Sequence, residues 1–174
     1  PEPSKEELAT FLETNSLPIG VESVDGYQQI YYLYDNIQVF ITNGRINHTQ
    51  PVVSGRNVAW VETIEGFPQI FLYDLVEKTK LQITQTGTNI NPSISGNKIV
   101  WEGLDNGVQQ VFYFDGYLLN QLSYNNISLR PKIKDNTAVF AQYTGEDGKP
   151  WRVISYDLTK LNEDDASQII KEGY

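Results

Sequence analysis

A segment of about forty residues occurs three times in this chain, and this repeat constrains the fold more than any other feature of the sequence. Each copy opens on a proline and carries an aromatic residue nine positions later, and both landmarks recur at spacings of 41 and 39 residues. The prolines are Pro51, Pro92 and Pro131, and the aromatic residues are Trp60, Trp101 and Phe140. Landmarks that keep one period indicate tandem copies of a single structural unit.

Within each unit, short apolar segments alternate with turn residues, which predicts four β-strands, a to d in chain order. Strand a is the segment that begins at the repeated proline. Strands b are expected over 57–62, 98–102 and 137–142, strands c over 70–73, 111–114 and 152–156, and strands d over 81–84, 119–123 and 168–170. One such sheet leaves two apolar faces exposed, and stacking sheets around an axis buries both. The predicted fold class is therefore all-β, a β-propeller or a partial propeller of about four four-stranded blades.

The N-terminal part of the chain holds an incomplete unit preceded by a short helix. Residues 30–35 repeat the aromatic strand c, and residues 19–21 supply the strand before it, but the proline segment of strand a is absent. Upstream, apolar residues recur at helical spacing and Ser4 followed by Glu7 forms a capping box, which predicts a helix within 4–15. The expected division is a helical segment over 1–16, then blades over 17–46 (partial), 47–86, 87–125 and 126–174.

The repeated residues resemble the TolB-like propeller repeats of bacterial periplasmic and surface proteins. The likeness rests on the Pro-x-[Ile/Val]-Ser opening, the Gly-containing hairpin, the aromatic strand that ends in Asp, and the Leu-x-Ile-Thr strand, and it covers about 19–173. The Ser-Pro-Asp-Gly turn of that family is shortened here to Ser54-Gly55 and Ser95-Gly96. The resemblance implies a periplasmic, secreted or cell-surface protein. Such blades serve several functions, so the likeness is more specific for the fold.

Three complete units and a partial one leave the closure of the ring open, since propellers have about four to eight blades. The chain could be a piece of a longer propeller, or it could close as a small four-bladed ring. Alternatively, two or more chains could combine, because an uncovered blade face is apolar. We expect an incomplete ring that is completed by a partner or by further sequence.

Residues that recur at equivalent positions are expected to be structural. Trp60, Trp101 and Phe140 are predicted to fill the core between blades, although aromatic platforms for sugars or peptides would use the same residue types. The aspartates that close strand c are predicted to accept backbone hydrogen bonds in the c–d turn, and a ring of metal ligands is the weaker alternative. These aspartates are Asp35, Asp74, Asp115 and Asp157.

Acidic residues also occupy the four hairpins between strands b and c. Turn chemistry explains the glycines and most of the acids. We expect all four hairpins to project from the same end of the propeller, where the acids would form a binding surface for a cationic segment. The candidate binding residues are Asp25, Glu65, Asp105 and Asp147.

Composition excludes several classes of function. The net charge of −9 disfavours nucleic-acid binding, and no apolar run approaches the ~18 residues of a membrane span. The chain has no cysteine and one histidine, His48, which is expected in the loop before the second unit. No nucleophile elbow, metal-binding motif or nucleotide-binding loop occurs. We therefore expect no catalytic residues, no metal and no cofactor, and the sequence does not indicate a small-molecule ligand.

These observations predict a non-catalytic module for protein interaction or self-assembly, with a protein partner or a second copy as its ligand. Two alternatives stay open. The chain could be an accessory propeller segment of a larger enzyme, such as a peptidase or a polysaccharide lyase, or it could be a structural subunit of a surface assembly.

Overall fold

The strands of the described residues form four separate antiparallel sheets. The structure is a computed structural model, and it describes residues 2–161. Sheet 1 contains β1 (Ile19–Val24), β2 (Tyr27–Tyr34) and β3 (Ile37–Phe40), and sheet 2 contains β4 (His48–Ser54), β5 (Asn57–Ile64), β6 (Phe67–Asp74) and β7 (Thr79–Gln82). Sheet 3 contains β8 (Asn89–Ser95), β9 (Lys98–Asp105), β10 (Val108–Phe114) and β11 (Leu119–Gln121), and sheet 4 contains β12 (Ser128–Lys134), β13 (Thr137–Tyr143) and β14 (Trp151–Asp157).

The predicted all-β class and the four-part repeat are confirmed. Sheets 2 and 3 carry strands a to d as sequential neighbours. Among the described residues, sheet 1 holds strands b, c and d, and strand a is absent there as the sequence predicts. Sheet 4 holds strands a, b and c, and the strand d expected over 168–170 lies outside the described residues. The connections between sheets cover 41–47, 83–88 and 122–127.

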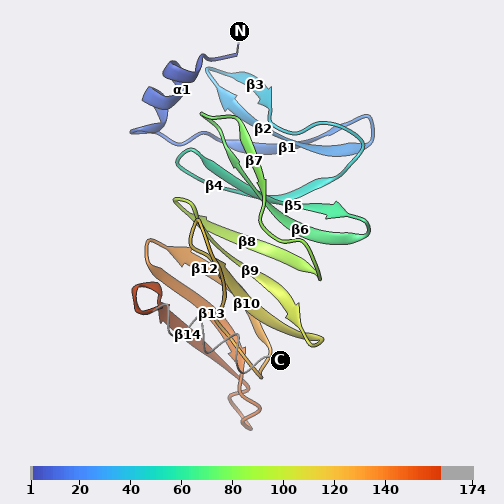
Figure 1. The fold of residues 1–174 in the computed structure, drawn as a ribbon, viewed down its shortest axis with the longest axis vertical. Helices are drawn as coiled ribbons and strands as arrows, with labels where there is room; N and C mark the ends of the chain where they lie inside the picture. The colour runs from blue at the N-terminus through green and yellow to red at the C-terminus, as the bar shows by residue number, and fades with distance from the viewer. Residues whose placement is uncertain (1, 162–174) are drawn as a thin grey trace.

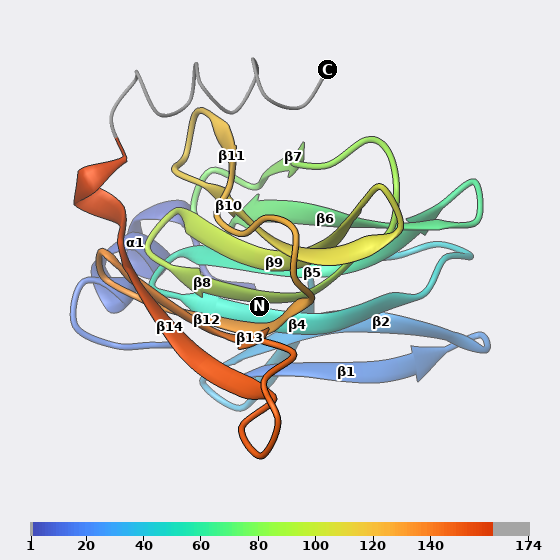
Figure 2. The same cartoon turned by 90° about the horizontal axis from the view of Figure 1, so that it is seen from below.

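The sheets follow one another in chain order along the molecule. Figure 1 shows sheet 1 beside α1 at the upper end and sheet 4 at the lower end, with sheets 2 and 3 between them. The view turned by 90° shows the strands of successive sheets stacked one sheet over the next (Figure 2). Sheets 2 and 3 therefore each have two neighbours, whereas sheets 1 and 4 stand at the two ends of the described stack.

The predicted N-terminal helix is present as α1 (Lys5–Leu12), shorter at its C-terminal end than the sequence indicates. Ser4 caps it, because the Ser4 side chain accepts from the Glu7 backbone N–H while the Glu7 carboxylate accepts from the Ser4 N–H. Leu8 is 1% exposed and packs into the core between sheets 1 and 2. A short 3-10 helix, η1 (Leu158–Lys160), follows β14.

The repeated proline marks a bulge in each strand a. The pairing of strands a and b shifts register at this point in sheets 2, 3 and 4. The residue before each proline has a positive φ of 54° to 56°, and these residues are Gln50, Asn91 and Arg130. A bulge leaves a backbone position outside the hydrogen-bonded ladder, which is where proline, with no N–H to donate, is tolerated in a sheet.

Each sheet packs its two faces against different neighbours. We call the face toward the preceding sheet the front face and the face toward the following sheet the back face. In sheet 2, Val58, Trp60 and Phe71 on the front face pack against sheet 1. Ala59 and Val61, together with the next strand's Ile70, form the back face and pack against sheet 3. A third core cluster lies between sheets 3 and 4.

Serines of strand a tie successive sheets together. Ser54 Oγ accepts from the backbone N–H of Gly96 in the next sheet at 2.8 Å, and Ser95 Oγ accepts from Asp135 N–H at 2.8 Å. The serine of the Pro-x-[Ile/Val]-Ser signature therefore holds the a–b turn of the following sheet. Sheet 4 has Lys134 at this position, and a lysine ammonium has no acceptor for a further turn.

Candidate interaction surface

The acids of the b–c hairpins serve mainly as turn residues. Asp25 and Glu65 have positive φ values of 52° and 51° and precede a glycine, the arrangement of a tight two-residue hairpin. Asp105 closes β9, where its Oδ2 accepts from Gln121 Nε2 at 3.2 Å. Asp147 lies in the longer hairpin between β13 and β14 and is exposed. Figure 1 shows the first three hairpins extending toward one side, while the fourth lies at the lower end.

The aspartates at the ends of strands c differ among the sheets. Asp74 Oδ1 accepts from the N–H groups of Val76 and Glu77 at 2.9 and 3.0 Å. Asp115 Oδ1 accepts from two successive N–H groups at 2.7 Å each, and Asp157 Oδ1 accepts from Thr159 N–H at 3.1 Å. Asp35 instead has a φ of 49° and forms a two-residue turn with Asn36, whose φ is 60°.

The hydrogen bonds at these turns lower the pKa of two of the aspartates. Burial acts to raise the pKa of Asp74, but the Arg56 guanidinium and the backbone N–H groups outweigh it, so the pKa lies below its ordinary value. The hydroxyl and N–H of Thr159 lower the pKa of Asp157. Both carboxylates therefore stay ionised and hold their turns down to acidic pH.

The repeated aromatic residues of strand b lie between sheets. Trp60, Trp101 and Phe140 are 0%, 1% and 3% exposed. Sheet 1 has Gly20 at the equivalent position, and the Tyr31 ring lies across it, where it would clash with a Cβ on Gly20. Sheet 1 thus lacks the strand b aromatic anchor that the other three sheets share.

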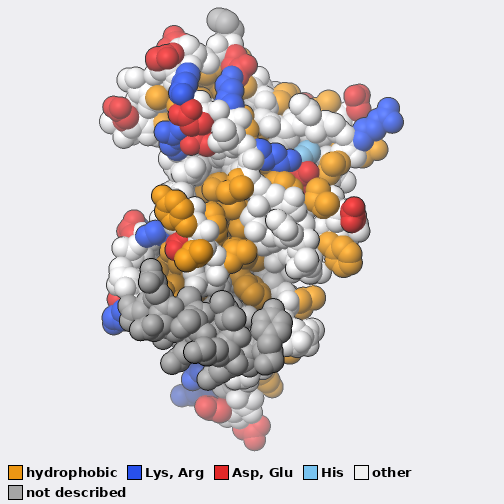
Figure 3. Space-filling model, in the orientation of Figure 1, with side chains coloured by type: hydrophobic (Ala, Val, Ile, Leu, Met, Phe, Trp, Pro, Cys, Tyr) orange, Lys and Arg blue, Asp and Glu red, His pale blue; other side chains and the backbone are white. Residues whose placement is uncertain are grey.

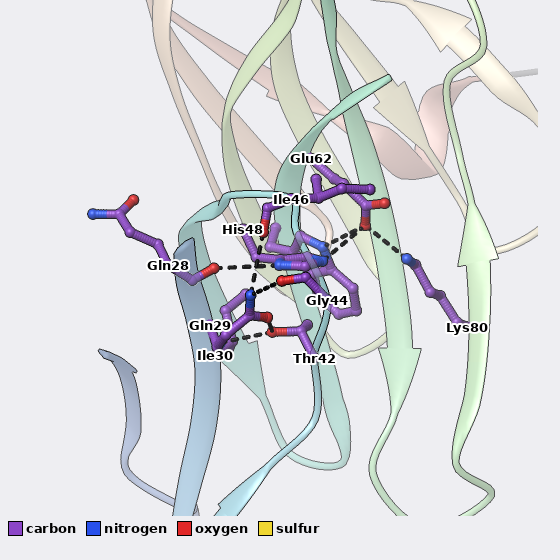
Figure 4. Close-up of polar contacts among 10 residues, drawn as sticks. Gln28, Gln29, Ile30, Thr42, Gly44, Ile46, His48, Glu62 and Lys80 are labelled. Atoms are coloured by element: carbon purple, nitrogen blue, oxygen red, sulfur yellow. Dashed lines mark hydrogen bonds and ion pairs between the residues drawn. The ribbon is translucent and has the colours of Figure 1, made fainter. Parts of the chain in front are cut away.

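A buried polar cluster joins sheets 1 and 2 (Figure 4). His48 lies in β4, and not in a loop as the sequence suggests, and it is 3% exposed. Its Nδ1 lies 3.3 Å from the Gln28 carbonyl oxygen of sheet 1, and its Nε2 lies 3.3 Å from Glu62 Oε2. The same Glu62 oxygen accepts from Lys80 Nζ at 2.6 Å.

Burial lowers the pKa of His48, although Glu62 and the carbonyl of Gln28 act in the opposite direction. The neutral ring carries one proton and can donate to only one of its two acceptors. The cluster provides no serine or cysteine nucleophile beside the histidine among the contacts of the described residues, and its contacts fit a structural bridge between sheets.

Buried glutamines form a second repeated feature, which our reading of the sequence missed. Each glutamine lies in strand c directly before its buried aliphatic residue. The glutamine Oε1 accepts a hydrogen bond from the hydroxyl of a Thr or Ser that follows strand d. The same hydroxyl accepts from the next backbone N–H of strand c. The pairs are Gln29–Thr42, Gln69–Thr84 and Gln110–Ser123. The signal was available, because a glutamine precedes the aliphatic residue in all three units.

The front face of sheet 1 is open. Val24, Leu33 and Phe40 on this face are 40%, 37% and 42% exposed. Beside the b–c hairpin the face is hollowed over ≈ 700 Å³, and this hollow is lined by Val24, Asp25, Tyr27, Gln29, Phe40, Thr42, Asn43, Gly44 and Arg45. Of the four acidic candidates predicted from the hairpins, Asp25 lines this hollow.

The back face of sheet 4 is open in the same sense. Val153 is 78% exposed, whereas the residues at its position in the other sheets, Ile30, Ile70 and Val111, are each 0% exposed. Tyr143 and Trp151 stand beside it at the hairpin end, 40% and 45% exposed, with their rings in edge contact at 5.4 Å.

Two further features are present on the described surface. A smaller hollow of ≈ 460 Å³ lies where the bulges of strands β4, β8 and β12 meet, and the buried Glu102 there accepts from Asn91 Nδ2 and Arg130 N–H.

Figure 3 shows hydrophobic side chains gathered across the middle of the face drawn in Figure 1. Tyr117, Leu118 and Leu119, at the outer edge of sheet 3, are 89%, 59% and 54% exposed.

Comparison with solved structures identifies the architecture as that of propeller domains. A candidate TolB from Agrobacterium tumefaciens matches with a TM-score of 0.59 and 18% identity, covering 82% of this chain and 57% of its own. The β-propeller domain of the trilobed protease from Pyrococcus furiosus matches with a TM-score of 0.61 and 12% identity, covering 80% and 48%. An acylaminoacyl peptidase from Pyrococcus horikoshii matches with a TM-score of 0.60 and 13% identity, covering 75% and 21%.

These likenesses show the fold, and the chain spans about half the length of the first two structures. No protein-family model matches the chain, and no curated protein matches it by sequence. Within the described residues, no helix has the length and apolar character needed to span a bilayer.

Proposed function

We propose that this chain is a non-catalytic interaction module built from TolB-like propeller blades, exported or surface-exposed, that binds another protein or another copy of itself through its open terminal faces. The observation that carries the proposal is the exposure of Val153. One structural position is fully buried in three sheets and 78% exposed in the fourth. Exposed apolar surface bounded by polar residues is characteristic of protein interaction sites.

The experiment is site-specific photo-crosslinking from each open face in the cells that produce the protein. A photoreactive residue replaces Leu33 in one variant and Val153 in another, and the matched control replaces Glu13, which is exposed at the end of α1. We expect Leu33 or Val153, and not Glu13, to give a discrete adduct whose partner and contact peptide are identified by mass spectrometry. Equal adduct formation at all three positions, or none at either face, would contradict the proposal.

The non-catalytic part has its own test. The purified chain should not turn over peptide or ester substrates, since His48 is held between Gln28 and Glu62 with no nucleophile beside it in the described residues. A hydrolytic activity that copurifies with the chain and disappears in His48→Gln would overturn this part of the proposal.

A second candidate is an accessory propeller of a larger peptidase. The solved structures with similar folds include propellers of a trilobed protease and an acylaminoacyl peptidase, which favours this class over a polysaccharide lyase. The same crosslinking separates the two candidates, because an accessory blade would form its adducts with a hydrolase domain.

A further inference from the structure

We propose that the open back face of sheet 4 in one copy of this chain packs on the open front face of sheet 1 in a second copy, so that two chains close one ring. This inference rests on the proposed function and specifies its partner. The contact is head-to-tail: each copy contributes a different face, and the two seams of the pair are identical.

The first support is continuity with the seams inside the chain. Back face packs on front face three times, between sheets 1 and 2, 2 and 3, and 3 and 4. Within residues 2–161, the stack ends with a front face on sheet 1 and a back face on sheet 4 that no other sheet covers (Figure 1). The open front face of sheet 1 is therefore the kind of face that receives a back face inside the chain. The open back face of sheet 4 is the kind that packs on a front face.

The second support is a match of shape at the hairpin ends of the two faces. In sheet 4, Tyr143 and Trp151 pair across β13 and β14 next to the hairpin and project from the surface. In sheet 1, Val24 and Tyr27 pair across β1 and β2 next to the hairpin and line the ≈ 700 Å³ hollow. Sheets that stack as the internal ones do bring their hairpin ends together, which places the projecting aromatic pair at the hollow.

Charge gives a third support. The back face of sheet 4 carries the exposed ammonium groups of Lys132 and Lys134 on strand a. The front face of sheet 1 carries Glu22, and Asp25 stands at the rim of its hollow. Arg45 also lines the hollow, where a guanidinium can stack on an aromatic ring such as that of Trp151.

Two copies give a ring within the known range of the fold. Four sheets per chain give eight for a pair, and propellers have about four to eight blades. A head-to-tail contact closes only when its rotations complete a full turn, and otherwise it generates an open filament. The alternative occupant of the two faces is a set of further blades from a longer polypeptide.

The experiment measures the solution mass of the full 174-residue chain by light scattering, for the wild type and for one variant of each face. Phe40→Glu places a charge in the hollow of sheet 1, and Val153→Glu places one on the back face of sheet 4. Both sites are exposed in the single chain, so each variant should fold with the circular dichroism spectrum of the wild type, and its melting temperature should fall only by the contribution of the lost contact between copies. If Phe40→Glu does not fold, Leu33→Glu replaces it on sheet 1. If Val153→Glu does not fold, Trp151→Ser replaces it on sheet 4.

The expected masses follow from head-to-tail geometry. The wild type should have twice the mass of one 19.8 kDa chain, and either variant alone should have half the wild-type mass, because each substitution occurs in both seams. An equimolar mixture of Phe40→Glu and Val153→Glu should recover two-chain particles, since one seam then joins two unaltered faces. The control Tyr117→Glu, at an 89% exposed site on sheet 3, should leave the wild-type mass unchanged.

Several outcomes would overturn the inference. These are a wild-type monomer at all concentrations, assemblies larger than two chains, or a mixture of the two variants that stays monomeric. A pair weakened by only one of the two variants would show like faces meeting and would also overturn it. A monomer that still crosslinks to a different protein from Leu33 or Val153 would leave the proposed function intact and reject only the second copy.

Discussion

The b strands of sheets 2 and 3 and that of sheet 1 occupy equivalent places but differ in how they are covered. In β5 and β9 five consecutive residues are buried in each strand, in the same order from the start of the strand. In β1 none is buried, and its last four residues are exposed. The strands belong to the same repeat, so the difference in burial comes from their neighbours. β5 and β9 each pair with a strand a and have a sheet on both faces. Within the described residues, β1 has neither a strand a beside it nor a preceding sheet.

The largest expected effect contrasts an inter-sheet tryptophan with a terminal one. Trp101→Ala should lower the free energy of unfolding by about 3–5 kcal/mol, because it leaves a cavity between sheets 2 and 3. Trp151→Ala, at a 45% exposed site, should lower it by less than about 1 kcal/mol in the Val153→Glu background, where contact between copies is absent. Urea unfolding measures both. Equal losses would mean that the terminal face is as well covered as the interior.

A pH-dependent effect is expected at the seam between sheets 1 and 2. The pKa of His48 is lowered in the folded protein from its ordinary value near 6.5, so the unfolded chain binds the proton more readily. The stability due to neutral His48 is present above pH 6.5 and falls as pH drops below it, by at most about 1.4 kcal/mol per pH unit for one proton.

Urea unfolding between pH 7.5 and 5.5 measures this dependence, with His48→Gln as the variant that removes the titrating group. The wild type should lose stability toward pH 5.5, and His48→Gln should lose less over the same interval. A wild type that gains stability toward acidic pH would show that charged His48 is the favoured bridge between Gln28 and Glu62.

The smallest expected effect separates a serine that bridges two sheets from one on an open face. Ser95→Ala removes the acceptor of the Asp135 N–H and should cost about 1 kcal/mol. Ser155→Ala, on the exposed part of β14, is the matched control and should change the free energy of unfolding by less than about 0.5 kcal/mol. Losses of the same size in both variants would remove the structural role assigned to the repeated serine.

The sequence was enough to predict the repeat, the all-β class, the capping box and the absence of strand a in the first unit. The repeat, the fold class and the missing strand could be predicted because the landmarks recur at a fixed spacing, and the capping box could be predicted because it is a local pattern. Which faces stay open could not be read in this way, since Val153 and Val111 look alike in the sequence and differ only in having a sheet beside them. The hollow of sheet 1 could not be predicted for a related reason: it lies on the front face of sheet 1, which no other sheet of the described residues covers.

The predicted placement of His48 in a loop was wrong for a local reason. The sequence placed it in a loop because the repeated proline was taken as the start of strand a, whereas the strand begins before the bulge. Residues preceding the proline therefore belong to the sheet, and this puts His48 opposite Glu62.

The central claim, that the internal faces are covered and the terminal faces open, is tested most directly by hydrogen exchange at the three indole N–H groups. The measurement follows the indole signals by NMR after transfer to D₂O, in the Val153→Glu variant so that contact between copies does not contribute. Trp60 and Trp101, whose Nε1 atoms face Glu62 and Asn89 inside the stack, should exchange slowly, and Trp151 should exchange at once. Rapid exchange at Trp60 or Trp101, or protection of Trp151 equal to theirs, would contradict the account.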